Sequence, residues 1–71
     1  MKDIIIHNKL PELRARKKVT QDTLAGALGV TRQTIISIEK GVYTPSLALA
    51  MKMSIYFALP IEEIFYQGDA L

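Results

Sequence analysis

Hydrophobic positions recur at the three- and four-residue spacing of α-helices in several short segments, which glycine, proline and hydroxyl residues separate. A first helix is predicted from Asn8, a suitable cap, to about Lys18, with Leu10 and Leu13 on its apolar edge. Its last turn is basic, which suits the negative end of a helix dipole. The first predicted element is therefore a short amphipathic helix.

Two further short helices are predicted on either side of a tight turn. Thr20 is a preferred N-cap for the second helix, which ends at Gly29. Thr31 is the N-cap for the third helix, which ends before Gly41. The expected buried positions are Leu24, Ala25 and Leu28 in the first of the pair, and Ile35 and Ile38 in the second. The pair covers about residues 20–40.

A proline marks the start of the C-terminal part. Pro45 pushes the residue before it out of the helical conformation, and Ser46 caps a fourth helix. The residues that recur at helical spacing along it are Leu47, Ala50, Met51, Ser54 and Phe57. Pro60 ends this helix, and the residues from Ile61 to Phe65 are predicted to form a last short helix.

The segment from Ile4 to Ile6 is β-branched and does not fit the first helix. Three interpretations stay open: a short strand that pairs with the tail around Phe65 and Tyr66, a packed arm, or a frayed terminus. The whole pattern predicts an all-α fold of five short helices in one domain over residues 1–71, with a short β-ribbon if the strand forms.

Composition excludes several functional classes. Hydrophobic residues make up 49% and charged residues 23% of the 71 residues, which is typical of a packed globular domain. The chain has no cysteine and one histidine, His7, so no disulfide, metal site or cofactor is expected. No apolar run approaches the roughly 20 residues that span a bilayer. A cytoplasmic, nucleoid-associated protein is expected.

Charge is unevenly distributed along the chain. Residues 1–40 hold eight Lys and Arg against four Asp and Glu, a net charge of +4, whereas residues 41–71 hold one against three, a net charge of −2. One end can therefore face a polyanion. An ordinary solvated surface explains the same charges, so charge alone does not decide.

The start of the third helix carries the most specific chemistry. It begins Thr31, Arg32, Gln33, Thr34, after a glycine-containing turn, as a helix that reads the DNA major groove does. Arg bonds guanine O6 and N7, and Gln bonds adenine N6 and N7. Residues 20–40 are therefore interpreted as a helix-turn-helix in which Arg32 and Gln33 contact bases.

The sequence resembles the lambda-repressor-like helix-turn-helix family, of the phage Cro and Xre type, in its short single-domain transcriptional regulators. The matching segments are Thr20 to Ala25, Leu28 to Ile35, Ile38 to Gly41, Tyr43, Pro45 to Leu47, and Ile61 to Phe65. The likeness covers about residues 8–66. It implies sequence-specific binding to double-stranded DNA, without catalysis and without a small-molecule effector domain.

The resemblance also implies roles for single residues. Arg32, Gln33 and Ser37 would face bases, and Gln21 would touch a phosphate and support Gln33. The sugar-phosphate backbone would be held by Thr31, Lys40, Tyr43 and Thr44, and Thr34 is counted with the DNA-binding set. Arg14 and Glu39 would form an internal ion pair, which removes both from the DNA surface.

Some positions depart from the family pattern. Gly26 lies inside the second helix, at a cost of about 1 kcal/mol relative to Ala. Ala58 stands where members often have Gly or Asn, so a left-handed backbone there would be strained. Ile36 is assigned to the exposed side of the third helix, either as a contact for a thymine methyl group or as an inert apolar residue.

Residues 58–67 are assigned to a dimer interface, because members of the family commonly dimerise there and the region is more apolar than a five-residue helix can bury. Its members are Leu59, Ile61, Ile64, Phe65 and Tyr66. A dimer would present two reading helices about 34 Å apart to an inverted-repeat operator.

The expected function is a homodimeric transcriptional regulator, a repressor in the first instance. The alternative is an antitoxin or anti-regulator whose main partner is another protein, with residues 62–71 as the feature that would serve it. Nothing in the sequence favours an enzyme: Glu62 and Glu63 diverge on a helix and have no accompanying nucleophile.

Overall fold

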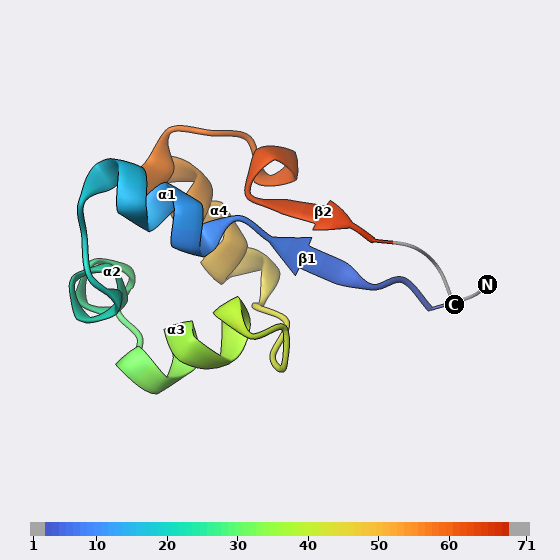
Figure 1. Cartoon of the computed structure of the whole chain (residues 1–71), viewed down its shortest axis with the longest axis horizontal. Helices are drawn as coiled ribbons and strands as arrows, with labels where there is room; N and C mark the ends of the chain where they lie inside the picture. Colours follow the sequence, from blue (N-terminus) through green and yellow to red (C-terminus); the bar gives the residue numbers. More distant parts are fainter. Residues whose placement is uncertain (1–2, 69–71) are drawn as a thin grey trace.

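The computed structural model describes residues 3–68, which form four α-helices and a small two-stranded sheet (Figure 1). In chain order the elements are β1 (Ile6–Asn8), α1 (Leu10–Lys17), α2 (Gln21–Leu28), α3 (Arg32–Glu39), α4 (Leu47–Phe57), the 3-10 helix η1 (Ile61–Glu63) and β2 (Phe65–Gln67). The predicted helical fold with a terminal β-ribbon is confirmed.

The ribbon joins the two ends of the described chain. β1 and β2 are antiparallel, with His7 opposite Tyr66 and Asn8 opposite Phe65. Beyond the strands, the Lys9 backbone N–H donates to the Ile64 carbonyl at 2.8 Å. Figure 1 shows the ribbon projecting from one side of the helices. The strand interpretation of the N-terminal segment is thus correct in kind, although the strand begins at Ile6 rather than Ile4.

The last predicted helix is shorter than expected. Only Ile61–Glu63 are helical, as a 3-10 turn, and Phe65 already belongs to β2. The turn is closed by i to i+3 hydrogen bonds from the Glu63 N–H to the Pro60 carbonyl and from the Ile64 N–H to the Ile61 carbonyl. Pairing with β1 requires an extended backbone from Phe65, which leaves too few residues for an α-helix.

Hydroxyl side chains cap three of the helices, as predicted. Thr20, Thr31 and Ser46 each accept a hydrogen bond from the backbone N–H three residues later, at 3.0, 3.2 and 3.1 Å. α2 ends at Gly29, which has a φ of 74°. α4 ends at Ala58 with a φ of 55°, so the strained left-handed alanine anticipated there is present.

The core lies between the helices and the tail. Its fully buried large side chains are Leu10, Leu24, Ile35, Ile38, Met53 and Ile64. In α4 the buried residues are Leu49, Ala50 and Met53, whereas Leu47 and Met51, placed at helical spacing from the sequence, are exposed. The helical spacing and the burial of Ala50 were thus predicted correctly, whereas packing against the other elements buries Leu49 and Met53 in place of Leu47 and Met51.

The assignment of Ile64 to the dimer interface is wrong. Its side chain has no exposed surface, because it closes the core of its own chain beneath the ribbon. It is therefore not available to a second copy. Leu59 and Phe65 are also partly buried against this core, and Tyr66 stays exposed.

Candidate nucleic-acid interface

α2 and α3 pack against each other through the apolar residues predicted from the sequence. Leu24 and Leu28 of α2 and Ile35 and Ile38 of α3 are all buried in the same cluster. The left-handed backbone of Gly29 allows the turn between the two helices. Burial of these faces fixes the opposite edge of α3 toward solvent.

That outer edge of α3 is polar. Thr31, Arg32 and Gln33 are exposed at its first turn, and Ser37 follows one turn later, partly buried. The Gln33 side-chain amide donates to the Ser37 hydroxyl oxygen at 3.3 Å. Two of the three predicted base-contacting side chains, Gln33 and Ser37, are therefore joined by a hydrogen bond.

The threonines at the start of α3 bond to each other. The Thr31 hydroxyl oxygen accepts from the Thr34 backbone N–H, and the two hydroxyl groups are 3.0 Å apart. Thr34 is partly buried and Thr31 exposed. The pair holds the first turn closed, and Arg32 and Gln33 of the same turn stay exposed.

The loop after α3 folds back toward the same edge. The Val42 and Tyr43 backbone N–H groups both donate to the Ser37 carbonyl, at 3.0 and 3.2 Å, after Gly41 turns the chain with a φ of 77°. A shallow hollow here is lined by Thr31, Gln33, Thr34, Ser37, Val42 and Tyr43. Lys40 and Thr44 flank it, both exposed.

Val42 is a surface residue that the sequence did not single out. Its side chain is 79% exposed in a hollow otherwise lined by the predicted DNA-binding residues. Its signal in the sequence was a lone apolar residue beside a loop glycine, which is too weak to interpret alone. Ile36, expected on the exposed side of α3, is partly buried instead.

A second hollow lies at the start of α2. Its lining residues are Arg14, Val19, Thr20, Gln21, Asp22 and Arg32. It brings the beginning of α2 next to the first turn of α3, so two helix N-termini and a guanidinium group lie together. Free N–H groups at helix N-termini and Arg side chains are groups that bind phosphate.

Glu39 is the centre of a partly buried polar network beside this surface. The Arg14 Nε and Nη2 atoms donate to its two carboxylate oxygens at 2.6 and 3.0 Å, so the predicted ion pair is present. The hydrogen bond from Arg14 to Glu39 raises the pKa of the Arg14 guanidinium, while burial opposes this and the carboxylate charge adds to it. Arg14 is therefore engaged internally.

Gln21 belongs to the same network. Its side-chain amide donates to Glu39 Oε1 at 3.1 Å, and Gln33 donates to Ser37. The expected support of Gln33 by Gln21 is thus absent from the hydrogen bonds of residues 3–68. Glu39 offers a charged acceptor, which makes a stronger partner than a neutral amide.

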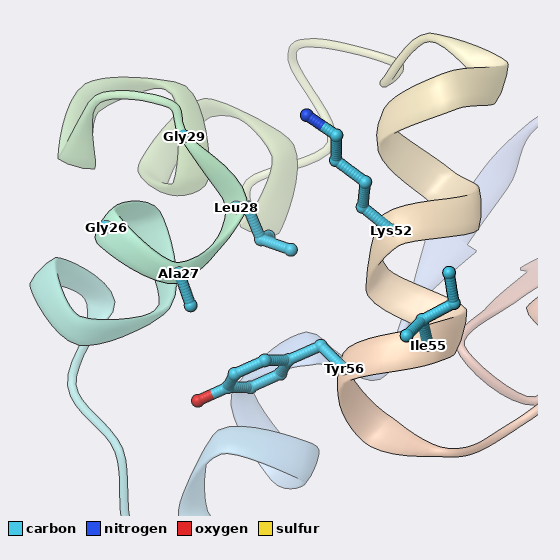
Figure 2. A pocket seen from close by; sticks show the side chains of 7 residues that line it. All are labelled: Gly26, Ala27, Leu28, Gly29, Lys52, Ile55 and Tyr56. Carbon is cyan, nitrogen blue, oxygen red and sulfur yellow. The ribbon is translucent and has the colours of Figure 1, made fainter.

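A third hollow has none of the predicted DNA-binding residues. It lies between α2 and α4 and is lined by Gly26, Ala27, Leu28, Gly29, Lys52, Ile55 and Tyr56 (Figure 2). The Lys17 ammonium lies 4.9 Å from the centre of the Tyr56 ring beside it, a cation–π contact. Lys52 and Ala27 therefore serve as comparison positions on another surface.

Two further observations concern metal binding and membrane-spanning helices. Within residues 3–68, no group of three His, Cys, Asp or Glu side chains has the arrangement of a metal site. None of the helices in this range has the length and apolar character to cross a membrane. The polar edge of α3 and the hollows beside it are the candidate site.

These features define a helix-turn-helix DNA-binding domain. The helix-turn-helix family matches residues 12–64, and the chain belongs to this family, in its Xre and lambda-repressor-like branch. Its named relatives are transcriptional regulators rather than enzymes. The protein is accordingly a helix-turn-helix transcriptional regulator.

Similar proteins come from archaea, bacteria and a phage. The chain is 55% identical over 62 residues to an HTH-type transcriptional regulator of Methanocaldococcus jannaschii, with 87% of this chain and 94% of that protein covered. It is 49% identical over 59 residues to the HTH-type transcriptional regulator YgzD of Bacillus subtilis, covering 83% and 89%. It is 30% identical over 62 residues to the cryptic phage CTXphi transcriptional repressor RstR of Vibrio cholerae, covering 87% of this chain and 56% of RstR.

A solved structure has the same fold. The restriction-modification controller protein C.AhdI from Aeromonas hydrophila aligns with a TM-score of 0.69 and 31% sequence identity, over 76% of this chain and 82% of that one. The likeness extends beyond the helix-turn-helix itself to most of the domain.

Proposed function

We propose that the protein binds a specific operator in double-stranded DNA through the first turn of α3, and that it acts in the cytoplasm as a homodimeric repressor of transcription. One observation carries the proposal. Arg32 and Gln33 are exposed on a helix whose opposite face, Ile35 and Ile38, is buried in the core. Side chains on such a fixed helix can read base edges with defined geometry.

The proposed contacts divide into two kinds. Base edges are read by Arg32, Gln33 and Ser37. The phosphate backbone is held by Thr31, Thr34, Lys40, Tyr43 and Thr44 on one side of α3 and by Gln21 on the other. Because the Gln21 side chain is bonded to Glu39, its phosphate contact uses the free backbone N–H at the start of α2.

The proposed dimer uses apolar surface that the single chain leaves open. Leu47 is 73% exposed at the start of α4, two residues after Pro45. Pro45 and Phe65 line one small cleft, and η1 packs against α4, so the tail lies beside that end of α4. The interface is therefore proposed to combine Leu47 and Met51 with Ile61 and Phe65, flanked by Leu59 and Tyr66.

The geometry of DNA favours binding by two copies. One α3 covers only a few base pairs, whereas a two-fold dimer places two such helices about 34 Å apart in successive major grooves. The relatives RstR, named as a transcriptional repressor, and C.AhdI, named as a controller protein, support regulation of transcription as the outcome. A dimer bound across a promoter blocks it by occupying the DNA.

Selection of bound duplexes from random DNA tests the proposal. The expected product is an inverted repeat whose half-sites are centred about one helical turn apart, or a multiple of it, bound by two copies. Sedimentation of the complex gives the number of copies. Recovery of sequences without any shared motif would overturn sequence-specific reading, and a single asymmetric half-site bound by one copy would overturn the dimer.

A further inference from the structure

Asn8 connects three parts of the fold, two through its side chain and one through its backbone. Its amide nitrogen donates to the Ile38 carbonyl at 3.0 Å and to the Glu39 carbonyl at 3.4 Å, both in the last turn of α3. Its carbonyl oxygen accepts from the Leu10 backbone N–H at 3.1 Å, at the start of α1. The Asn8 backbone is the last residue of β1, opposite Phe65 in β2. Asn8 therefore ties the ribbon and α1 to the end of α3.

The bond to α1 explains only half of these contacts. The prediction that Asn8 is the N-cap of α1 is wrong by one residue, because the N-cap is Lys9, which has no side-chain cap; the Asn8 carbonyl oxygen accepts from Leu10, the first residue of the helix. The amide nitrogen instead serves the end of α3, where helix carbonyls lack partners within the helix. The Ile38 carbonyl also accepts from the Gly41 N–H, whereas among the described hydrogen bonds Asn8 is the donor to the Glu39 carbonyl. The role of the nitrogen is thus separate from the bond to Leu10.

The polar contacts that orient α3 are concentrated at its C-terminal end. Arg14 and Gln21 hold the Glu39 side chain, and Asn8 holds the carbonyls of the same turn. The first turn, by contrast, is closed by a bond between its own residues, Thr31 and Thr34. The reading end of α3 is therefore held from the far end of the helix, together with its buried isoleucines.

Such an arrangement makes small rotations matter. A helix of eight residues is about 12 Å long, so a rotation of about 10° at its C-terminal end moves its first turn by roughly 2 Å. Side chains at a recognition site must be held to about 0.5 Å to keep their hydrogen-bond geometry. Loss of one hydrogen bond at the C-terminal end of α3 can therefore displace the first turn by more than base reading tolerates.

We infer that Asn8 is a positioning residue for DNA reading: it fixes the direction of α3 from the β-ribbon, without contacting DNA itself. The inference rests on the proposed reading of bases by Arg32 and Gln33. It assigns the N-terminal strand a part in sequence discrimination, because β2 sets the place of Asn8 through the β1–β2 register.

Asn8→Asp separates the two halves of the side chain. An aspartate keeps an oxygen for the Leu10 N–H, and it replaces the donor to α3 by a carboxylate oxygen that faces two carbonyls. Gln67→Glu is the matched control, because it makes the same amide-to-carboxylate change at an exposed position of the same ribbon. Asn8→Ser, which retains an oxygen for the Leu10 N–H and lacks the reach to α3, replaces Asn8→Asp if that variant fails to fold.

The readout is the ratio of affinities for two duplexes of equal length: the sequence selected from random DNA by the wild-type chain, and a scrambled version of it. Asn8→Asp is expected to lower this ratio roughly tenfold at a temperature where the protein is folded, with the ratio of Gln67→Glu unchanged. Ile64→Val, which weakens the core beneath the ribbon, controls for stability alone. Equal ratios in Asn8→Asp and Gln67→Glu would overturn the inference, as would an equal loss in Ile64→Val.

A second measurement needs no DNA. Residual dipolar couplings of backbone amides report the direction of α3 relative to α2, and they are expected to differ from wild type in Asn8→Asp and not in Gln67→Glu. If the wild-type chain selects no DNA sequence, the proposed function fails and the couplings alone decide the inference. Unchanged couplings in Asn8→Asp overturn it.

Discussion

Arg14 and Glu39 face each other with two hydrogen bonds, from Nε at 2.6 Å and from Nη2 at 3.0 Å. Their side chains are 19% and 8% exposed. The pair connects α1 to α3. The Glu39 carboxylate accepts a third hydrogen bond, from the Gln21 side-chain amide. Because the two groups are bonded to each other, the pair is proposed to act on DNA binding only by fixing where α3 lies.

Removal of one partner of this ion pair leaves the other without its counter-charge. Glu39→Ala is expected to lower the free energy of unfolding by about 2–3 kcal/mol, because the Arg14 guanidinium and the Gln21 amide lose their charged acceptor in a mostly buried position. Urea unfolding measures the loss. A double-mutant cycle with Arg14→Ala checks the cause: the two losses must be strongly non-additive, and simple addition would mean that the pair contributes no coupling.

Ala58 offers a stabilising substitution. Its left-handed backbone favours glycine, so Ala58→Gly is expected to raise the free energy of unfolding by about 0.5–1 kcal/mol. Ala48→Gly, at an exposed position inside α4, is the matched control and is expected to lower it by about 1 kcal/mol. Thermal unfolding of both variants checks the signs. A loss of stability in both would mean that Ala58 is not strained.

Lys40 is proposed to hold a phosphate. Lys40→Ala is expected to weaken binding to all duplexes alike and to reduce the slope of log affinity against log salt by about 1. Lys52→Ala removes the same charge on the α2–α4 surface of Figure 2 and is expected to leave that slope unchanged. Titrations at several salt concentrations compare them. Equal effects of the two substitutions would mean that only net charge matters.

Leu47 is proposed to lie in the dimer interface. Leu47→Glu is expected to raise the dimer dissociation constant about ten- to a hundredfold, since it places a charge in an apolar contact. Ala27, an exposed apolar residue of α2, gives the control Ala27→Glu, with no expected change. Analytical ultracentrifugation measures both. Dissociation by Ala27→Glu and not by Leu47→Glu would place the interface on α2.

The local features of the fold were predictable from the sequence, because their causes are local. The caps at Thr20, Thr31 and Ser46 follow from hydroxyl groups placed before apolar periodic segments, and the end of α2 follows from Gly29. The exposed first turn of α3 follows from the burial of its opposite face. These features include most of the candidate site.

Features that depend on distant parts of the chain were predicted poorly. Pairing with β1 shortens the last helix and draws Ile64 into the core, which no pattern within residues 58–67 indicates. The face of α4 was likewise set by its neighbours. The bonds from Asn8 to the end of α3 connect residues that are 30 and 31 positions apart in the sequence. The Arg14–Glu39 pair was expected only because of the family resemblance.

The central claim is that the first turn of α3 reads bases, and one comparison tests it most directly. Affinities of wild type, Arg32→Ala, Gln33→Ala and Arg16→Ala are measured for the selected duplex and for duplexes with single base changes in each half-site. Arg16 is an exposed arginine on α1 and serves as the control for charge. Arg32→Ala and Gln33→Ala are each expected to lose about 1–3 kcal/mol of affinity and to stop discriminating at one base position, with Arg16→Ala still discriminating at all of them. Undiminished discrimination in both α3 variants would contradict the account.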